Sequence, residues 1–319
     1  MKYNRVQKIG LFKPGPNGNP LLGEEFLDAG LFMPQGGNMY FGWAGYMARP
    51  NVFEPEHLAM IRSVRSYNGV LSVSLEPNLG TTPAECLGAV ATPAGRAKLK
   101  ILFTALQAER ELGGEGFKIV VRFASEMNQI SINNPYAGAP DAFKTSFNVV
   151  REVRDEVARS VLLTFSPAIN PASGNLFHPA PSGIMPYWPG GQGIEVLSCT
   201  IYCRPQNKEY TASPAAVEAS LKESLEKVRV RMNAYFGSSL ATARMLMIDE
   251  MSGSMKPKAQ TVPESSTNHA LPPENDLMIQ KMLHRLLPAG NREIDYATIF
   301  LKKEWGGDAT LRFIVESNP

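Results

Sequence analysis

Two glutamates each follow an apolar run that predicts a buried strand. Glu126 comes at the end of KIVVRFASEMN, residues 118–128, and Glu250 comes at the end of RMLMIDEM, residues 244–251. Two further strand candidates lie between them, so both carboxylates face one mouth if the strands close into a barrel. Paired carboxylates there suit glycoside hydrolysis, in which one protonates the departing oxygen and the other attacks the sugar or activates water. The alternative is a pair of structural carboxylates held in ion pairs by Arg122 or Arg204.

Other polar residues stand where predicted strands end. Arg122 precedes Glu126 by four residues, so strict alternation places both side chains on one face, where Arg122 could keep a carboxylate ionised. The same alternation turns Asp249 away from the face of Glu250. Glu76 is a third carboxylate at a strand end, placed to bind a sugar hydroxyl or to pair with Arg122. The remaining polar residues that follow predicted strands are Asn128, Ser166, Asn170, Tyr202, Arg204, Glu304 and Trp305.

Short apolar strands alternate with amphipathic helices along the chain. The predicted strands cover residues 39–45, 70–78, 117–125, 161–170, 195–203, 244–251 and 295–303. The predicted helices cover residues 54–66, a segment after Thr92-Pro93, one from Asp141, one from Ser213-Pro214, and residues 276–287. Thr92 followed by Pro93 is typical of an N-cap with a first-turn proline. The polar stretch 252–275, directly after Glu250, is long enough to predict a lid or a cleft wall.

Strands separated by helices predict parallel βαβ units. Seven strands are clear, and an eighth is expected either at VQKIGLF, residues 6–12, or near residues 62–67. Eight strands would form a single-domain (β/α)8 TIM barrel over residues 1–319, with residues 1–35 as a candidate N-terminal extension. An open doubly wound sheet is the alternative, although it usually carries a Gly-rich phosphate turn that this sequence lacks.

Composition limits the classes of partner. The chain has 319 residues, 44% of them hydrophobic, and its 32 Lys and Arg against 30 Asp and Glu give a net charge of +2. Without a clustered excess of one sign, nothing favours nucleic acid or an acidic membrane. No apolar run would span a bilayer, and the N-terminus lacks a signal-peptide pattern. We therefore expect a cytoplasmic protein, or a secreted or periplasmic one if a leader was removed; the sequence leaves the oligomeric state open.

Cysteine and histidine spacing predicts no metal site and no disulfide. Cys199 and Cys203 lie four apart in one predicted strand, which separates them by roughly 13 Å, too far to bridge. Together with Cys86 they are expected to be three free thiols. Neither H-x-x-x-H nor C-x-x-C occurs, so no zinc ligand set is expected.

The segment VRFASEMN resembles the acid/base segment of glycoside hydrolase family 26, whose pattern is R-x-x-H-E-M-N. PDAFKTSFNVVREVRDEVARSVLLTFSPAIN resembles that family's helix and following strand, which ends in W-S-P-N. YWPGGQGIEVLSCTIY is similar to its Y-x-P-G segment, RMLMIDEMSG to its nucleophile strand ending in E-x-G, and VLSVSLEPN to its I-T-W-E-P strand. Order and spacing agree over residues 118–253. The family belongs to clan A, the (β/α)8 retaining glycosidases.

The resemblance implies a role for each matching position. Glu126 matches the acid/base and Glu250 the nucleophile. Arg122 and Asn128 match positions that flank the acid/base, and Tyr202 matches the tyrosine beside the nucleophile. The retaining mechanism that this implies needs no metal and no organic cofactor. The partner would be a polysaccharide or oligosaccharide substrate.

Tryptophans are candidate sugar platforms, because sugars bind on aromatic rings. Trp43, Trp188 and Trp305 each fall near a predicted strand end or loop, and ordinary packing is the alternative for each. Trp188 follows Tyr187 in the family's Y-x-P-G loop, and Trp305 stands where members often place a sugar-stacking aromatic. Tyr40 is expected in the core.

Three departures from the family pattern bear on specificity. Ser125 replaces the His before the acid/base, QISINNPY replaces the aromatic residues after E-M-N, and Phe165 replaces the Trp of W-S-P-N. In family members that cut β-mannan these positions touch sugar, so the resemblance does not imply specificity for mannan. The leading hypothesis is a retaining, endo-acting hydrolase of a β-linked polysaccharide or exopolysaccharide. The alternatives are a glycan-binding barrel without turnover, and a carbohydrate isomerase or lyase, which would usually need a metal cluster or a Lys or His base.

Overall fold

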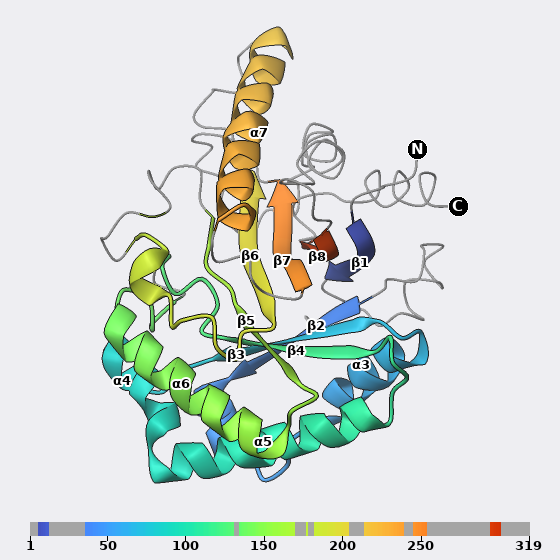
Figure 1. Cartoon of the computed structure of the whole chain (residues 1–319), viewed down its shortest axis with the longest axis vertical. Coiled ribbons are helices and arrows are strands. Elements are labelled where there is room, and N and C mark those ends of the chain that lie inside the picture. Colours follow the sequence, from blue (N-terminus) through green and yellow to red (C-terminus); the bar gives the residue numbers. More distant parts are fainter. Residues whose placement is uncertain are drawn as a thin grey trace, which may run out of the picture.

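The computed structural model describes residues 6–12, 36–130, 134–169, 177, 182–203, 214–238, 245–253 and 294–300 (Figure 1). The strands are β1 (Val6–Phe12), β2 (Gly36–Gly42), β3 (Val70–Glu76), β4 (Lys118–Phe123), β5 (Leu162–Phe165), β6 (Val196–Cys203), β7 (Met245–Gly253) and β8 (Ile294–Phe300). The helices are α2 (Trp43–Ala48), α3 (Pro55–Ser66), α4 (Pro83–Gly88), α5 (Pro93–Glu111), α6 (Pro140–Val157) and α7 (Pro214–Phe236), with short 3-10 turns at Ala89–Ala91 and Met185–Tyr187.

The strands form one parallel sheet in the order β1-β8-β7-β6-β5-β4-β3-β2. Each strand therefore lies beside its neighbour in sequence, and the order never reverses. This excludes the doubly wound alternative, which needs such a reversal. The eighth strand is VQKIGLF, whereas residues 62–67 fall mostly within α3, so residues 6–12 belong to the sheet and not to an extension.

The sheet curls strongly, and contacts cross its interior. The Asn38 amide on β2 donates to the carbonyl oxygen of Asp249 on β7, with 3.4 Å between the two atoms. A Cβ on Gly36 of β2 would lie 2.3 Å from the Tyr296 hydroxyl oxygen on β8, so this close approach requires glycine. Hydrogen-bonded pairing between β1 and β2 is not among the described strand pairs, so complete closure into a (β/α)8 barrel stays a prediction.

Capping residues explain where two helices begin. Thr92 caps α5 by accepting from the Gly95 N–H at 3.0 Å, and Pro93 occupies the first turn, as the sequence predicts. Thr82 and Glu85 form a reciprocal capping box at the start of α4. Each cap satisfies backbone N–H groups that would otherwise lack a partner.

The helices cover the outer face of the sheet and make the main core with it. The outward side chains of the strands pack with apolar side chains of α3, α5 and α6, and Figure 1 shows α5 and α6 side by side across the sheet. The interior has an apolar floor and a polar upper layer. The floor consists of Val70, Val120, Val196, Met245, Met247 and Tyr296. The upper layer contains Asn38, Ser72, Ser74, Arg122, Thr164, Ser166, Ser198, Thr200 and Asp249.

The predicted strand at residues 39–45 extends too far at its C-terminal end. The aromatic run 39–45 predicts a continuous strand, but β2 ends at Gly42, and Trp43 begins α2. Tyr40, expected in the core, is 37% exposed on β2. The predicted strand 161–170 is too long, because β5 ends at Phe165. The other predicted strands agree with the observed ones apart from a few residues at their ends.

A β-bulge interrupts β7 close to its candidate catalytic residue. Cys199 on β6 pairs with Ile248, but the next residue, Thr200, pairs with Glu250, so Asp249 is an extra residue in β7. The pairing with β8 shifts over the same residues. Strict alternation therefore holds from Met245 and Met247 to Asp249, but it no longer fixes the face of the next residue, Glu250.

Several predictions concern residues outside this description. They are the predicted lid from residue 254 to residue 275, the predicted helix at residues 276–287, and Trp305. The side chain of Cys203 also lies outside the described residues. Cys86 and Cys199 are free and buried, as predicted. None of the helices in the described ranges is long and apolar enough to cross a membrane.

Candidate active site

Glu126 sits on a tight turn that begins where β4 ends. Ala124 has φ 49° and Glu126 has φ 56°, a left-handed conformation that non-glycine residues rarely adopt. The Glu126 N–H donates to the Ser166 carbonyl oxygen at 2.9 Å, and the Glu126 carbonyl oxygen accepts from the Gln129 N–H at 2.8 Å. The turn means that alternation does not continue from Arg122 to Glu126. Backbone strain of this kind persists only when surrounding contacts fix it, and it concentrates at functional sites.

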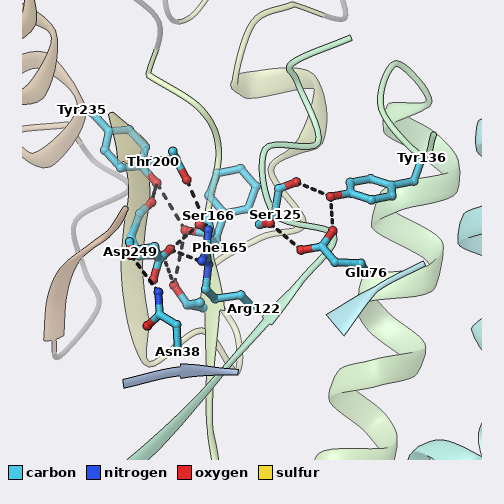
Figure 2. Close-up of polar contacts among 12 residues, drawn as sticks. Asn38, Glu76, Arg122, Ser125, Tyr136, Phe165, Ser166, Thr200, Tyr235 and Asp249 are labelled. Atoms are coloured by element: carbon cyan, nitrogen blue, oxygen red, sulfur yellow. Dashed lines mark hydrogen bonds and ion pairs between the residues drawn. The ribbon is translucent and has the colours of Figure 1, made fainter. Parts of the chain in front are cut away.

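A buried tyrosine and a serine bind Glu76 directly beside this turn (Figure 2). The Ser125 hydroxyl donates to Glu76 Oε1 at 2.8 Å, and the Tyr136 hydroxyl donates to Glu76 Oε2. The Tyr136 hydroxyl also lies 2.8 Å from the Ser125 carbonyl oxygen. Ser125 and Tyr136 are buried, whereas Glu76 is half-buried. The serine that replaces the family histidine is thus engaged with a carboxylate at the end of β3.

Two asparagines fix the same turn. The Asn134 amide lies 3.4 Å from Glu126 Oε2 and 3.1 Å from the Gln129 carbonyl oxygen. Asn128 exchanges two hydrogen bonds with Ala168, because its amide donates to the Ala168 carbonyl oxygen at 3.0 Å and its side-chain oxygen accepts from the Ala168 N–H at 2.8 Å. Asn128 therefore ties the turn to the chain after β5, as a supporting residue would. We call Glu76, Ser125, Glu126, Asn134 and Tyr136 the mouth cluster.

Burial shapes the titration of Tyr136. Burial raises the pKa of its hydroxyl well above the usual value of 10, and the neighbouring Glu76 carboxylate raises it further. Glu126 adds a smaller effect of the same sign. Tyr136 therefore stays a hydrogen-bond donor at neutral pH. The carboxyls of Glu76 and Glu126 are close enough to act on one phenol.

A second polar group fills the interior below the turn. Arg122 on β4 forms an ion pair with Asp249 on β7, with 3.1 Å between Nε and Oδ2, and both side chains are fully buried. The Ser166 and Ser198 hydroxyls both donate to Asp249 Oδ2. Arg122 also donates through Nη2 to the Thr200 hydroxyl at 3.2 Å. Asp249 was expected to face away from Glu250, but its carboxylate points into the interior, where regular alternation from Met245 and Met247 places it. The Glu250 side chain is not among those described, so the relative orientation of the two stays a prediction.

Hydroxyl groups extend this interior network outward. The Thr164 and Ser198 hydroxyl oxygens are 2.6 Å apart, and because Ser198 donates to Asp249, Thr164 is the donor of the pair. The Tyr235 hydroxyl on α7 donates to the Ser198 carbonyl oxygen at 2.8 Å. We call Arg122, Ser166, Ser198, Thr200 and Asp249 the interior cluster; Figure 2 shows it beside the Glu76 contacts.

The structure separates the predicted aromatic platforms. Trp43 is fully buried and packs near Tyr46, with ring centroids 5.7 Å apart, so it is a core residue and cannot stack on a sugar. Trp188 is half-buried and meets Phe165 edge to face, with ring centroids 5.1 Å apart. Tyr187 is buried, and its hydroxyl accepts from the Gly138 N–H at 3.1 Å. Trp305 lies outside the described residues.

Two predicted residues are described only by their backbone. Tyr202 lies in β6 and Glu250 in β7, but neither side chain is among those described. Arg204 and Asn170 lie outside the described residues altogether. Within the described ranges, no group of three His, Cys, Asp or Glu side chains could hold a metal ion.

Sequence reasoning overlooked two residues of the mouth cluster. Tyr136 and Asn134 lie in the segment QISINNPY, which carried no motif of its own. Only the position of this segment directly after Glu126 could have drawn attention to it.

Comparison with known proteins gives a likeness of fold. No family model matches the sequence, and no curated protein matches it. Among solved structures, the chain is similar to the catalytic domain of the family 26 endo-β-1,4-mannanase of Bacillus sp. JAMB-750, at 14% identity and a TM-score of 0.59, covering 98% of this chain and 85% of the other. A family 26 β-mannanase of Bacteroides ovatus gives 14% identity and a TM-score of 0.55, covering 98% and 88%. A family 5 glycoside hydrolase of Prevotella bryantii B14 gives 11% identity and a TM-score of 0.53, covering 98% and 94%.

Each of these three likenesses covers 98% of this chain. The structural neighbours are TIM-barrel glycoside hydrolases of families 26 and 5, which agrees with the family resemblance of the sequence. At such low identity the likeness establishes the fold. Function has to be argued from the residues at the mouth.

Proposed function

We propose that this protein is a retaining glycoside hydrolase of a β-linked polysaccharide, with Glu126 as acid/base and Glu250 as nucleophile. One observation carries the proposal: β4 and β7 meet across the interior. Arg122 Nε and Asp249 Oδ2 lie 3.1 Å apart. Arg122 precedes Glu126 by four residues, and Asp249 directly precedes Glu250. Two strands that touch at this depth bring their next residues to one mouth, as a double displacement requires.

The surroundings of Glu126 support the role of an acid/base. The carboxyl is half-buried, it lies on a strained turn, and the Asn134 amide contacts Oε2 at 3.4 Å. A second carboxyl, Glu76, lies nearby, since both carboxyls act on the phenol of Tyr136. The proposed role requires Glu126 to hold its proton in the first step.

The reaction would run in two balanced steps. Glu250 attacks the anomeric carbon, the bond to the leaving oxygen breaks, and Glu126 gives its proton to that oxygen. Water then gives a proton to Glu126, attacks the anomeric carbon and releases Glu250. A separation of about 5 to 5.5 Å between the two carboxyls is required.

The substrate class follows from the neighbours and from the departures at the mouth. The similar structures include enzymes described as endo-β-1,4-mannanase and broad-specificity endoglucanase, and we extend β-linked glycans to this chain as a proposal. Ser125, bound to Glu76 and Tyr136, stands where the family has a sugar-contacting His. We therefore expect a preference other than that of the mannanases.

The test uses purified full-length chain against β-mannan, glucomannan, mixed-linkage β-glucan, cellulose, xylan and bacterial exopolysaccharides, with reducing ends and anomeric configuration measured by NMR. Glu126→Gln and Glu250→Gln should each lower turnover by about 10²-fold or more. Glu152→Gln is the matched control, because its exposed carboxylate pairs with Arg96 at 3.2 Å on the helical surface; it should act like wild type.

Three outcomes would contradict the proposal. Hydrolysis that survives Glu250→Gln would remove the nucleophile assignment. Inverted products would remove the retaining mechanism. Glycan binding at wild-type strength with no turnover on any substrate would leave the glycan-binding barrel as the function.

A further inference from the structure

Four strands hold the bulge of β7 from the interior. Asp249 Oδ2 accepts from Ser166 at the end of β5 and from Ser198 on β6, and it pairs with Arg122 on β4. The backbone of the same residue is held as well, because the Asn38 amide on β2 donates to its carbonyl oxygen. The Asp249 side chain is fully buried.

The bulge changes the register of the residue that follows. With regular pairing, Thr200 would lie opposite Asp249; instead it lies opposite Glu250. Thr200 occupies an interior position, since its hydroxyl accepts from Arg122. Asp249 thus occupies one interior position. The backbone of Glu250 pairs with Thr200, which also occupies an interior position. Bulges next to active sites re-aim a side chain in this way.

We infer that Asp249 is the positioning residue for the proposed nucleophile, with Arg122, Ser166 and Ser198 holding its carboxylate. The inference rests on the proposed function and extends it to how β7 is shaped. A buried carboxylate bound to a guanidinium and two hydroxyls cannot move without leaving charges unpaired. It therefore fixes the backbone one residue before Glu250. Displacing a reacting group by about 1 Å can cost on the order of 10²-fold in rate.

The chain offers a matched control at the opposite end of the strands. Arg154 is buried and pairs with Glu195, with 2.9 Å between Nη1 and Oε1. Glu195 stands directly before β6, and its Oε2 accepts from the N–H of Leu163 on β5 at 3.0 Å. This arginine–carboxylate pair also ties strands together, but it lies at their N-terminal ends. Barrel residues at that end serve stability and not chemistry.

The first experiment separates kcat from KM in four proteins: wild type, Asp249→Asn, Ser198→Ala and Glu195→Gln. We expect Asp249→Asn to lower kcat by about 10²-fold and to change KM by less than about threefold, because the glycan contacts remain. Ser198→Ala removes one donor to Asp249 and should lower kcat by about tenfold; it serves if Asp249→Asn does not fold. Glu195→Gln should lower the unfolding temperature and keep kcat. Equal kcat in Asp249→Asn and Glu195→Gln would overturn the inference.

A second measurement does not depend on turnover. Hydrogen–deuterium exchange of the peptide 245–253 should be at least about tenfold faster in Asp249→Asn, while Glu195→Gln leaves that peptide unchanged, since local opening follows local contacts. If no glycan is hydrolysed by wild type but this exchange result holds, the proposed function fails and the anchoring of β7 stands. If wild type hydrolyses glycan and Asp249→Asn changes neither exchange nor kcat, the anchoring fails and the function stands.

Discussion

The mouth cluster and the interior cluster lie on neighbouring strands, yet they are built by opposite means. The mouth cluster has two half-buried carboxyls, depends on a turn with two left-handed residues, and draws two members from one loop. The interior cluster is fully buried, draws its members from strands or their immediate ends, and centres on one ion pair. At the mouth a carboxyl can exchange protons with water. In the interior each charge faces a charge, because an unpaired one would be very costly there.

This difference separates stability from chemistry. Buried ion pairs seldom stabilise a fold more than apolar residues of similar volume would, so their retention calls for another reason. Here that reason would be geometry, because Arg122 and Asp249 connect the strands that carry Glu126 and Glu250. Cutting the interior cluster should therefore damage both folding and turnover. Cutting the mouth cluster should damage turnover far more than folding.

The largest effect is expected from Arg122→Met. This change leaves the Asp249 carboxylate buried without its cation, which costs about 3–5 kcal/mol. Urea denaturation, followed by circular dichroism, measures the free energy of unfolding. The double variant Arg122→Met/Asp249→Leu is the control, and it should recover most of the lost stability because both charges are gone.

The double variant also sharpens the comparison of the two clusters. It should fold and still fail to hydrolyse glycan, because the bulge has lost its anchor. Full activity in the folded double variant would show that the interior cluster has no part in positioning the catalytic residues. If Arg122→Met is as stable as wild type, then leaving the Asp249 carboxylate without its cation does not destabilise the fold.

A smaller effect is expected from Tyr136→Phe at the mouth. The change removes the donor to Glu76 and the contact with the Ser125 carbonyl oxygen, so the turn loosens and kcat should fall about tenfold, or 1.4 kcal/mol. Tyr46→Phe is the matched control, because Tyr46 on α2 is also a buried tyrosine that lies outside both clusters. Its hydroxyl donates to the carbonyl oxygen of Lys98 on α5 at 3.1 Å.

Both tyrosine variants should lose about 1–2 kcal/mol of stability, because each removes the hydroxyl donor of a buried tyrosine. Only Tyr136→Phe should slow hydrolysis. If the two variants lower kcat equally, the mouth cluster has no special part in placing Glu126.

The elements could be predicted from the sequence because their signals are local. Periodic apolar residues, Thr-Pro starts and short strands predict the βα units. For the eighth strand the sequence left two candidates, and the structure shows that VQKIGLF is the strand. Where the prediction failed, a local signal misled: the aromatic residues of 39–45 favour a strand, yet Gly42 ends β2 and Trp43 enters a helix. Closure between β1 and β2 depends on long-range geometry and stays a prediction.

The site could be predicted only in part, since its positions are local but its contacts are not. Glu76, Glu126 and Asn128 lie at strand ends as expected. The bulge at Asp249 and the left-handed turn at Glu126 both break alternation, and no residue type announces either of them. Tyr136 reaches Glu76, sixty residues earlier in the chain, through the folding of its loop. The sequence contains no sign of that contact.

The smallest effect is expected at high pH, where one tyrosine reports on each cluster. Burial raises the pKa of Tyr136 and of Tyr235 well above 10; Glu76 adds to the shift of Tyr136, and Cys199 and Asp249 add to that of Tyr235. A pKa raised by folding contributes stability that is fully present below the unfolded value of about 10 and is lost as pH rises through the folded value. The free energy of unfolding should therefore decline above pH 10.

Absorbance of tyrosinate near 295 nm measures this titration, and Tyr136→Phe and Tyr235→Phe should each remove one late step. The two steps should differ in their response to Glu76→Gln, which removes a negative neighbour of Tyr136 alone. That change should lower the pKa of Tyr136 and leave Tyr235 unmoved, because Tyr235 belongs with Ser198 and Asp249 in the interior. An equal shift of both steps would mean that the clusters form one electrostatic unit, and the separation of chemistry from support would no longer hold.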